Sequence, residues 1–124
     1  MSFKPDNFTV WFELPVTDID KAIAFYSNVF QTEMNRVDDM GPNPIAFFPT
    51  ADDKGVGGHL YPGKPAADGN GPTIHLACPD TLEATAERFK EAGGAVLSDP
   101  VTIPAGRFIY AVDPDGNSIG LFAA

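Results

Sequence analysis

The chain has 124 residues, of which 44% are hydrophobic and 20% charged, the composition of one ordinary globular domain. Its formal net charge of −9 argues against nucleic acid and anionic membranes as partners, because both require a basic surface. The single cysteine excludes an internal disulfide, and we find neither a secretory signal pattern in residues 1–8 nor an apolar run of about 20 residues, so we expect a cytoplasmic protein.

The first half of the sequence predicts a strand, a helix and three further strands. Residues 9–16 alternate between apolar and polar side chains, which is typical of a strand with one buried face. Apolar residues then recur at helical spacing over residues 21–30, and Asp18 is placed to cap that helix. The three further strands are expected over residues 33–39, 44–49 and 56–61.

The second half predicts the same order of elements. A strand is expected over residues 73–78, because apolar side chains again alternate there. Asp80 with Glu83 three residues later is a capping-box pattern, and it predicts a helix that ends at the glycine pair 93–94. The three further strands are expected over residues 95–103, 108–113 and 118–122, the last two joined by a tight turn at 113–117.

The two halves therefore read as a repeat of one unit. We expect a single domain over residues 1–124, built from modules at 1–62 and 63–124. Residues 62–72 are rich in glycine and proline, which indicates an exposed joint between the modules.

Three segments of this repeat are similar to those of a known family. They are Phe-Glu-Leu-Pro-Val-Thr-Asp-Ile-Asp-Lys-Ala-Ile-Ala-Phe-Tyr at 12–26, Gly-Gly at 93–94 and Asp-Pro-Asp-Gly-Asn at 113–117. With them, the chain resembles the vicinal-oxygen-chelate superfamily of glyoxalases, bleomycin-resistance proteins and extradiol dioxygenases. The resemblance implies an α+β fold in which two tandem βαβββ modules form a curved mixed sheet with an open cavity. It also implies a homodimer, which the 10 phenylalanines favour.

The resemblance implies a position for a divalent metal, held by one residue from the first and last strands of each module. Carried over one at a time, these positions fall on Trp11, His59, Thr73 and Gly120. Indole has no free lone pair, threonine is a poor ligand and glycine has no side chain, so only His59 is competent. We therefore expect the standard metal site to be lost and no cofactor to be bound.

Two alternatives use residues two positions further along the opening strands. Because side chains two apart share a face of a strand, Glu13 and His75 are expected to face the cavity. With His59 they would form a relocated metal site of two histidines and a carboxylate, as in a metal-dependent lyase, isomerase or dioxygenase. Without a metal, Glu13 with His75 alongside would supply general acid or base catalysis.

Other residues are candidates for the wall of the cavity. Tyr61 and Phe122 occupy equivalent places near the ends of the last strands of the two modules. Arg107 follows a bend, and it would meet either an anionic group of a substrate or a surface acid. Gly57 and Gly58 are expected to leave room beside His59.

The leading interpretation is a glyoxalase and bleomycin-resistance-like protein that binds a small organic molecule in the cavity. The lining residues expected are Trp11, Glu13, His59, Tyr61, Thr73, His75, Arg107 and Phe122. Its action would be that of a lyase or an isomerase without the standard metal. The alternatives are the enzyme with the relocated metal and a structural or regulatory dimer that binds no ligand.

Overall fold

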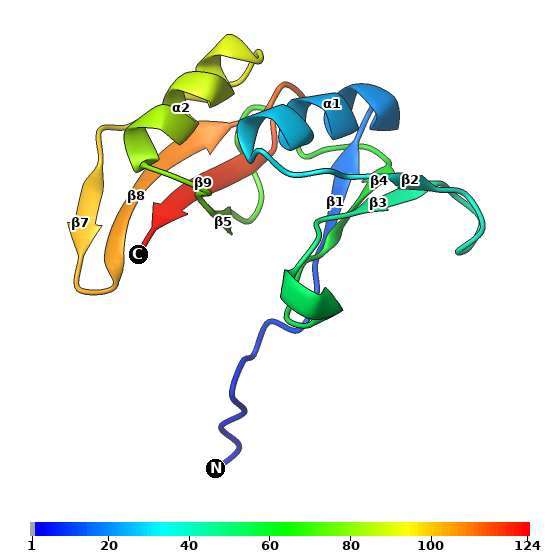
Figure 1. The fold of residues 1–124 in the computed structure, drawn as a ribbon, viewed down its shortest axis with the longest axis horizontal. Helices are drawn as coiled ribbons and strands as arrows, with labels where there is room; N and C mark the ends of the chain where they lie inside the picture. Colours follow the sequence, from blue (N-terminus) through cyan, green and yellow to red (C-terminus); the bar gives the residue numbers. More distant parts are fainter. Residues whose placement is uncertain (1) are drawn as a thin grey trace.

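The first half of the chain folds into a four-stranded sheet with one helix packed on it. A computed structural model describes residues 2–124. The helix is α1 (Ile19–Val29), and a short 3-10 turn, η1, spans Ala51–Asp53. The strands are β1 (Glu13–Val16), β2 (Arg36–Val37), β3 (Ile45–Phe47) and β4 (His59–Pro62). They lie in the order β1-β4-β3-β2, with β1 parallel to β4 and at one edge of the sheet (Figure 1).

The second half repeats the arrangement. Its helix is α2 (Leu82–Glu91). Its strands are β5 (Ile74–Ala77), β6 (Ala95–Val96), β7 (Val101–Ile103), β8 (Gly106–Val112) and β9 (Ser118–Ala123). They lie in the order β5-β9-β8-β6, β7 also pairs with β8, and β5 is an edge strand parallel to β9. The predicted α+β fold of two βαβββ-like modules is therefore confirmed.

The strand predicted over residues 95–103 is wrong in one respect, because it divides into β6 and β7. Ala95 lies opposite Val112 whereas Val101 lies opposite Phe108, so a step of six residues on one strand matches a step of four on the other. The two extra residues form a bulge. At the bulge the hydroxyl of Ser98 accepts a hydrogen bond from the amide of Tyr110, in place of a backbone carbonyl.

Both helices begin at a side-chain cap, although only one cap was predicted correctly. The Asp18 carboxylate accepts a hydrogen bond from the amide of Lys21 at 3.1 Å, as expected. In the second module the cap is Thr81, whose hydroxyl accepts from the amide of Ala84, and not Asp80. The Asp80 carboxylate is engaged elsewhere, since it pairs with Arg88 at 2.8 Å.

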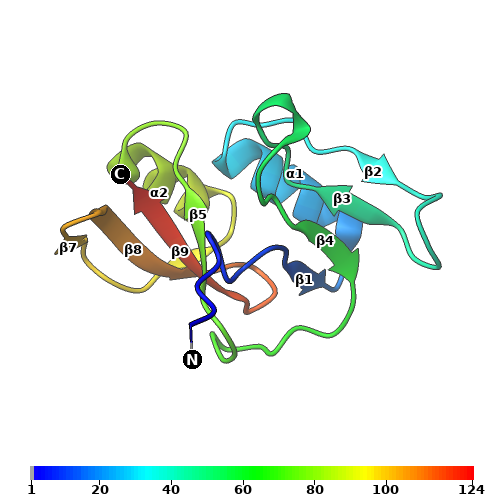
Figure 2. The ribbon, with the colours of Figure 1, turned by 90° about the horizontal axis from the view of Figure 1, so that it is seen from below.

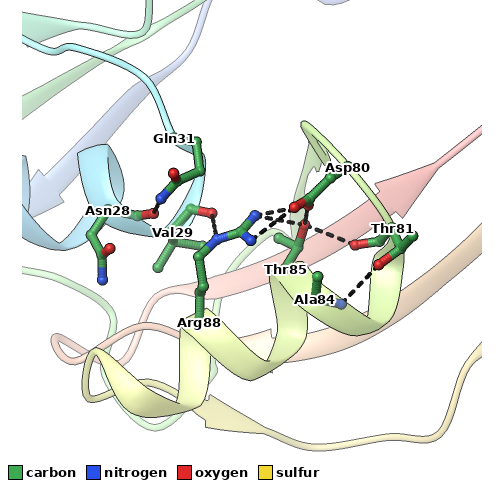
Figure 3. Close-up of polar contacts among 8 residues, drawn as sticks. All are labelled: Asn28, Val29, Gln31, Asp80, Thr81, Ala84, Thr85 and Arg88. Carbon is green, nitrogen blue, oxygen red and sulfur yellow. Dashed lines mark hydrogen bonds and ion pairs between the residues drawn. The ribbon is translucent and has the colours of Figure 1, made fainter.

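Arg88 also joins the two modules (Figure 3). Its Nε donates to the carbonyl of Val29 in the last turn of α1, at 2.9 Å, while its two terminal nitrogens donate to Asp80. Thr85 donates a further hydrogen bond to the same carboxylate. A helix leaves its last carbonyls without intrahelical partners, so the guanidinium satisfies one of them and anchors α2 to α1.

One apolar core lies beneath both helices. The rings of Phe25 on α1 and Phe89 on α2 meet edge to face, with centroids 5.1 Å apart. Fully buried side chains from both sheets continue this core, among them Val16, Leu60, Ile119 and Leu121. The helices therefore cover one side of each sheet, and the other side of each sheet is left open. Within residues 2–124 there is no helix of the length and apolarity that a bilayer crossing requires.

Candidate functional site

The edge strands β1 and β5 face each other across the junction of the two modules. In Figure 2 the segment that precedes β1 runs between them. An open pocket of about 750 Å³ lies there, and it is lined by residues of both modules. Its lining includes Phe12, Glu13, Val56, Thr73, Ile74 and His75.

Strand pairing places two site residues of each module at corresponding positions. In the first sheet Glu13 is the partner of His59, and in the second sheet His75 is the partner of Gly120. Trp11 lies two positions before Glu13, the first residue of β1, and Thr73 lies one position before Ile74, the first residue of β5. The register therefore matches Glu13, rather than Trp11, with His59, and His75, rather than Thr73, with Gly120.

Both ring nitrogens of His59 are engaged. The indole Nε1 of Trp11 donates to His59 Nδ1 at 2.9 Å, and His59 Nε2 lies 3.2 Å from Glu13 Oε1. Indole nitrogen can only donate, so Nδ1 is the unprotonated nitrogen and Nε2 bears the hydrogen of the ring. The His59 side chain is 13% exposed and that of Glu13 is 67% exposed. Trp11 therefore fixes the imidazole in one neutral tautomer, and the imidazole in turn holds Glu13.

His75 has different surroundings on the second sheet. Its ring meets those of Phe108, Tyr110 and Phe122 edge to face, with centroids 5.0, 6.2 and 6.2 Å away. It also lies over Gly120, where a Cβ atom would overlap the imidazole. The space that a side chain at position 120 would take is thus filled by His75. Beside it, the hydroxyls of Thr73 and Ser118 share a hydrogen bond of 2.5 Å.

The structure brings together only part of the predicted site. Glu13, Thr73 and His75 line the pocket between β1 and β5. His59 is not part of the lining, but it contacts Glu13, which is. Trp11 lines a smaller neighbouring hollow of about 280 Å³ with Phe47 and Phe48.

The remaining predicted residues lie outside the lining of this pocket. The ring of Tyr61 lies 6.4 Å from that of His59 on the open face of the first sheet. Phe122 is stacked on Phe108 on the second sheet. Arg107 forms a bidentate ion pair with Glu83 at the start of α2, at 2.9 and 3.1 Å. Of its two predicted partners, it therefore meets a surface acid.

Some features of the site were not evident from the sequence. Phe12, Val56 and Ile74 line the pocket, although the strand alternation indicated only that Phe12 and Ile74 were apolar. The expected room beside His59 is used differently, because a Cβ atom at Gly58 would overlap the ring of Phe12, and Gly58 has a φ of +74°. Its glycine therefore lets Phe12 pack against the turn before β4.

These residues do not fit the divalent metal that the fold family implies. Both nitrogens of His59 are occupied, position 120 has no side chain, and the His75 ring fills the place where a ligand would stand. Within residues 2–124 no three His, Cys, Asp or Glu side chains are grouped so as to hold a metal ion. The polar side chains that line the pocket are instead those of Asn7, Thr9, Glu13, Thr73 and His75, of which the carboxylate and the imidazole can transfer protons.

The single thiol of the chain, that of Cys78, is not activated as a nucleophile. Cys78 follows β5 directly, and it is half-buried. Burial raises the pKa of its thiol, which disfavours the thiolate form that reacts. We therefore leave Cys78 out of the candidate chemistry.

Comparison with known proteins agrees with the fold. Two curated relatives, from Mycobacterium bovis and Mycobacterium tuberculosis, bear the name "Putative glyoxylase CFP32" and are 32% identical over 108 residues. The match covers 86% of this chain but 40% of each relative, so the chain spans well under half of their length.

Solved structures show the same architecture at low sequence identity. A glyoxalase/bleomycin resistance protein from Albidiferax ferrireducens is 20% identical with a TM-score of 0.71, and the match covers 95% of this chain and 99% of that one. The fosfomycin resistance protein FosX from Listeria monocytogenes is 21% identical with a TM-score of 0.67, covering 98% and 93%.

A family model extends over most of the chain. The model of the Glyoxalase/Bleomycin resistance protein/Dioxygenase superfamily matches residues 9–121, which include most of both modules, both helices and all but one of the residues that line the pocket between β1 and β5. The chain belongs to this superfamily.

Proposed function

We propose that this protein binds a small organic molecule in the pocket between β1 and β5, and that it does so without a divalent metal. One observation carries the proposal. The pocket of about 750 Å³ joins Glu13 of one module to Thr73 and His75 of the other, within a largely apolar lining. Apolar walls with a few convergent polar groups are the usual form of a small-molecule site.

Proton transfer is the chemistry that these groups supply. Glu13 is held by His59 and lines the pocket, where its carboxylate is placed to accept a proton from a bound molecule. His75 lies on the opposite wall, where its imidazole can donate or accept one. We propose an isomerase reaction, in which one group removes a proton from the substrate and the other returns a proton at a second atom, or a lyase reaction, in which the electron pair left by the removed proton forms a double bond while a neighbouring group departs with a proton from the other residue.

A metal titration tests the metal-free part of the proposal. Purified protein is titrated with Ni²⁺, Zn²⁺ and Mn²⁺ in a calorimeter, and metal retained after gel filtration is counted by mass spectrometry. We expect no stoichiometric binding. One metal per chain that is lost in His59→Ala would contradict the proposal. Such a result, with sharply weaker binding in Glu13→Gln, would establish the relocated metal site on Glu13, His59 and His75.

A pocket-blocking substitution tests the location of binding. Val56 lines the pocket and is 43% exposed, so Val56→Trp fills the pocket without disturbing the core. The control is Leu97→Trp, at an exposed position between β6 and β7. With 2-naphthylmethanol as the probe, we expect calorimetric binding to wild type and to the control, and loss of binding in Val56→Trp. Equal binding to all three proteins would contradict the proposed location.

A further inference from the structure

We infer that the pocket between β1 and β5 selects organic cations over neutral molecules and rejects organic anions. The inference rests on the proposed function, since it names the substrate class of the same pocket. Its basis is the carboxylate of Glu13, the absence of lysine and arginine from the lining within residues 2–124, and the aromatic rings at the pocket.

The histidine that contacts Glu13 brings no positive charge to it. Because Trp11 donates to His59 Nδ1, the imidazole is neutral in this arrangement, and its Nε2 lies 3.2 Å from Glu13 Oε1. A neutral imidazole contacts the carboxylate without cancelling its charge. The two-thirds exposure of the Glu13 side chain leaves it open to a second, charged partner.

Within residues 2–124, no lysine or arginine lines this pocket. Each of the three arginines is paired with acids elsewhere. Arg36 pairs with Asp20 and Asp38, and Arg88 pairs with Asp80. Arg107, for which the sequence left open a contact with an anionic group of a substrate, pairs with Glu83. An anionic ligand would therefore meet Glu13 with no compensating cation, in a protein whose net charge is −9.

Aromatic rings around the pocket add to the preference for cations. Phe12 belongs to the lining, and Tyr110, which is 41% exposed, lies beside the lining residue His75. The face of an aromatic ring is electronegative, so it attracts an ammonium group as well as an apolar ring. A planar ring with an attached ammonium satisfies both the carboxylate and these walls.

Three probes of one size and shape test the inference: 2-naphthylmethylamine, 2-naphthylmethanol and 2-naphthoate, each titrated at neutral pH by calorimetry. A partly exposed ion pair contributes modestly, so we expect the amine to bind roughly two- to fivefold more tightly than the alcohol, and the naphthoate most weakly. The preference should shrink at high salt, because salt screens exposed charges.

Matched charge-removing variants locate the preference. Glu13→Gln should bring the amine and the alcohol to nearly equal affinity. Glu91→Gln removes the same charge from the exposed end of α2 and should leave the preference intact. A naphthoate preference, or an amine preference that survives in Glu13→Gln, would overturn this inference alone. Failure of all three probes to bind would overturn the proposed function as well.

Discussion

His59 determines the arrangement of the polar groups at the site. Its backbone is fixed by pairing with Glu13 and by the hydrogen bond from its amide to the Phe12 carbonyl, at 3.1 Å. Its ring is fixed by Trp11 on one nitrogen and Glu13 on the other. A side chain held at both ends loses its freedom to change tautomer, and this keeps Glu13 in a defined position.

Replacing Trp11 with phenylalanine should release this tautomer. Trp11→Phe keeps an aromatic ring but removes the indole donor, so His59 Nδ1 loses its partner. We expect nitrogen chemical shifts of the imidazole to show one tautomer, with hydrogen on Nε2, in wild type and a mixture in the variant. Since Trp11 is 42% exposed, the loss in unfolding free energy should be about 0.5 kcal/mol. Phe8→Leu, at an exposed position outside the site, is the control. A wild-type ring with hydrogen on Nδ1 would contradict the arrangement.

Tyr26 is a second residue whose hydrogen bond can be tested alone. Its buried hydroxyl donates to the Asp113 carboxylate at 2.6 Å, and Asn117 donates to the same carboxylate and to the Pro15 carbonyl. Tyr26→Phe removes only the hydroxyl. We expect a loss of about 1–3 kcal/mol in the free energy of unfolding, measured with urea.

The same residue predicts how stability falls at alkaline pH. Burial, and then the charge of Asp113, raise the pKa of Tyr26 well above its ordinary value. A raised pKa stabilises the fold fully below the pKa of the unfolded tyrosine, about 10, and this stabilisation is lost as the pH rises beyond it. Wild type should therefore lose stability more steeply than Tyr26→Phe above about pH 10. Parallel curves for the two proteins would contradict this, and Tyr110→Phe, at an exposed tyrosine, is the control.

At the scale of residues, the alternation of the strands predicted part of the pocket lining but not how its side chains pair. The strand period was enough to place Glu13 and His75 on one face, and the structure puts both in the same pocket. The hydrogen bond from Trp11 to His59 was not predictable, because it joins segments 48 positions apart whose register depends on the whole sheet. For the same reason the pairing of Arg107 with Glu83 had to be left open.

Among the elements, α2 shows how a local signal can be read one residue out of place. The sequence Asp80-Thr81 offers two acceptors for the start of the helix. Thr81 caps the helix, because its hydroxyl accepts a hydrogen bond from the amide of Ala84. The Asp80 carboxylate instead accepts hydrogen bonds from Arg88, which lies on the same side of the helix about two turns later. The choice depends on Val29 of the other module, since the hydrogen bond from Arg88 to its carbonyl holds the guanidinium in place. No reading of α2 by itself contains that information.

The Asp80–Arg88 pair predicts a loss of stability in acid. Arg88, and then Thr85, lower the pKa of Asp80 to about 2. A lowered pKa stabilises the fold above the pKa of the unfolded aspartate, about 3.9, and this stabilisation is lost as the pH falls towards 2. We expect the unfolding free energy of wild type to decline over that interval and to decline less in Asp80→Asn. Asp99→Asn, on the exposed bulge between β6 and β7, is the control. An unchanged acid profile in Asp80→Asn would show that the pair does not contribute.

The bulge between β6 and β7 is the feature of the strands that the sequence did not predict. Alternation over residues 95–103 is compatible with one long strand, and the two inserted residues become visible only against β8. The glycine pair at 93–94 was predictable as the end of α2, because Gly93 has a φ of +112°, a conformation that other residues rarely adopt.

For the whole molecule, the open faces of the two sheets are where we expect a second chain to associate. Both faces carry exposed or half-buried aromatic side chains, among them Trp11, Tyr61, Tyr110 and Phe122. Apolar surface of this kind is commonly covered by a second chain. We therefore propose a homodimer that covers these faces.

Light scattering after gel filtration measures this directly. We expect a mass of twice the 13.2 kDa chain. Tyr110→Glu places a charge on the open face of the second sheet and should shift the protein to the monomer, whereas Met40→Glu, at an exposed position in the loop between β2 and β3, should not. A monomeric wild type would contradict the proposed homodimer while leaving the pocket unaffected.

The location of ligand binding distinguishes the proposed site from a second large cavity of the molecule. A groove of about 620 Å³ runs along α1 on the helix side, bordered by Phe25, Asn28 and Asp113. Amide shifts recorded by NMR during titration with 2-naphthylmethanol should change at Glu13, Thr73 and His75, together with the single indole signal of Trp11. Changes confined to Phe25, Asn28 and Asp113, with Glu13 and His75 unmoved, would contradict the assignment of the site.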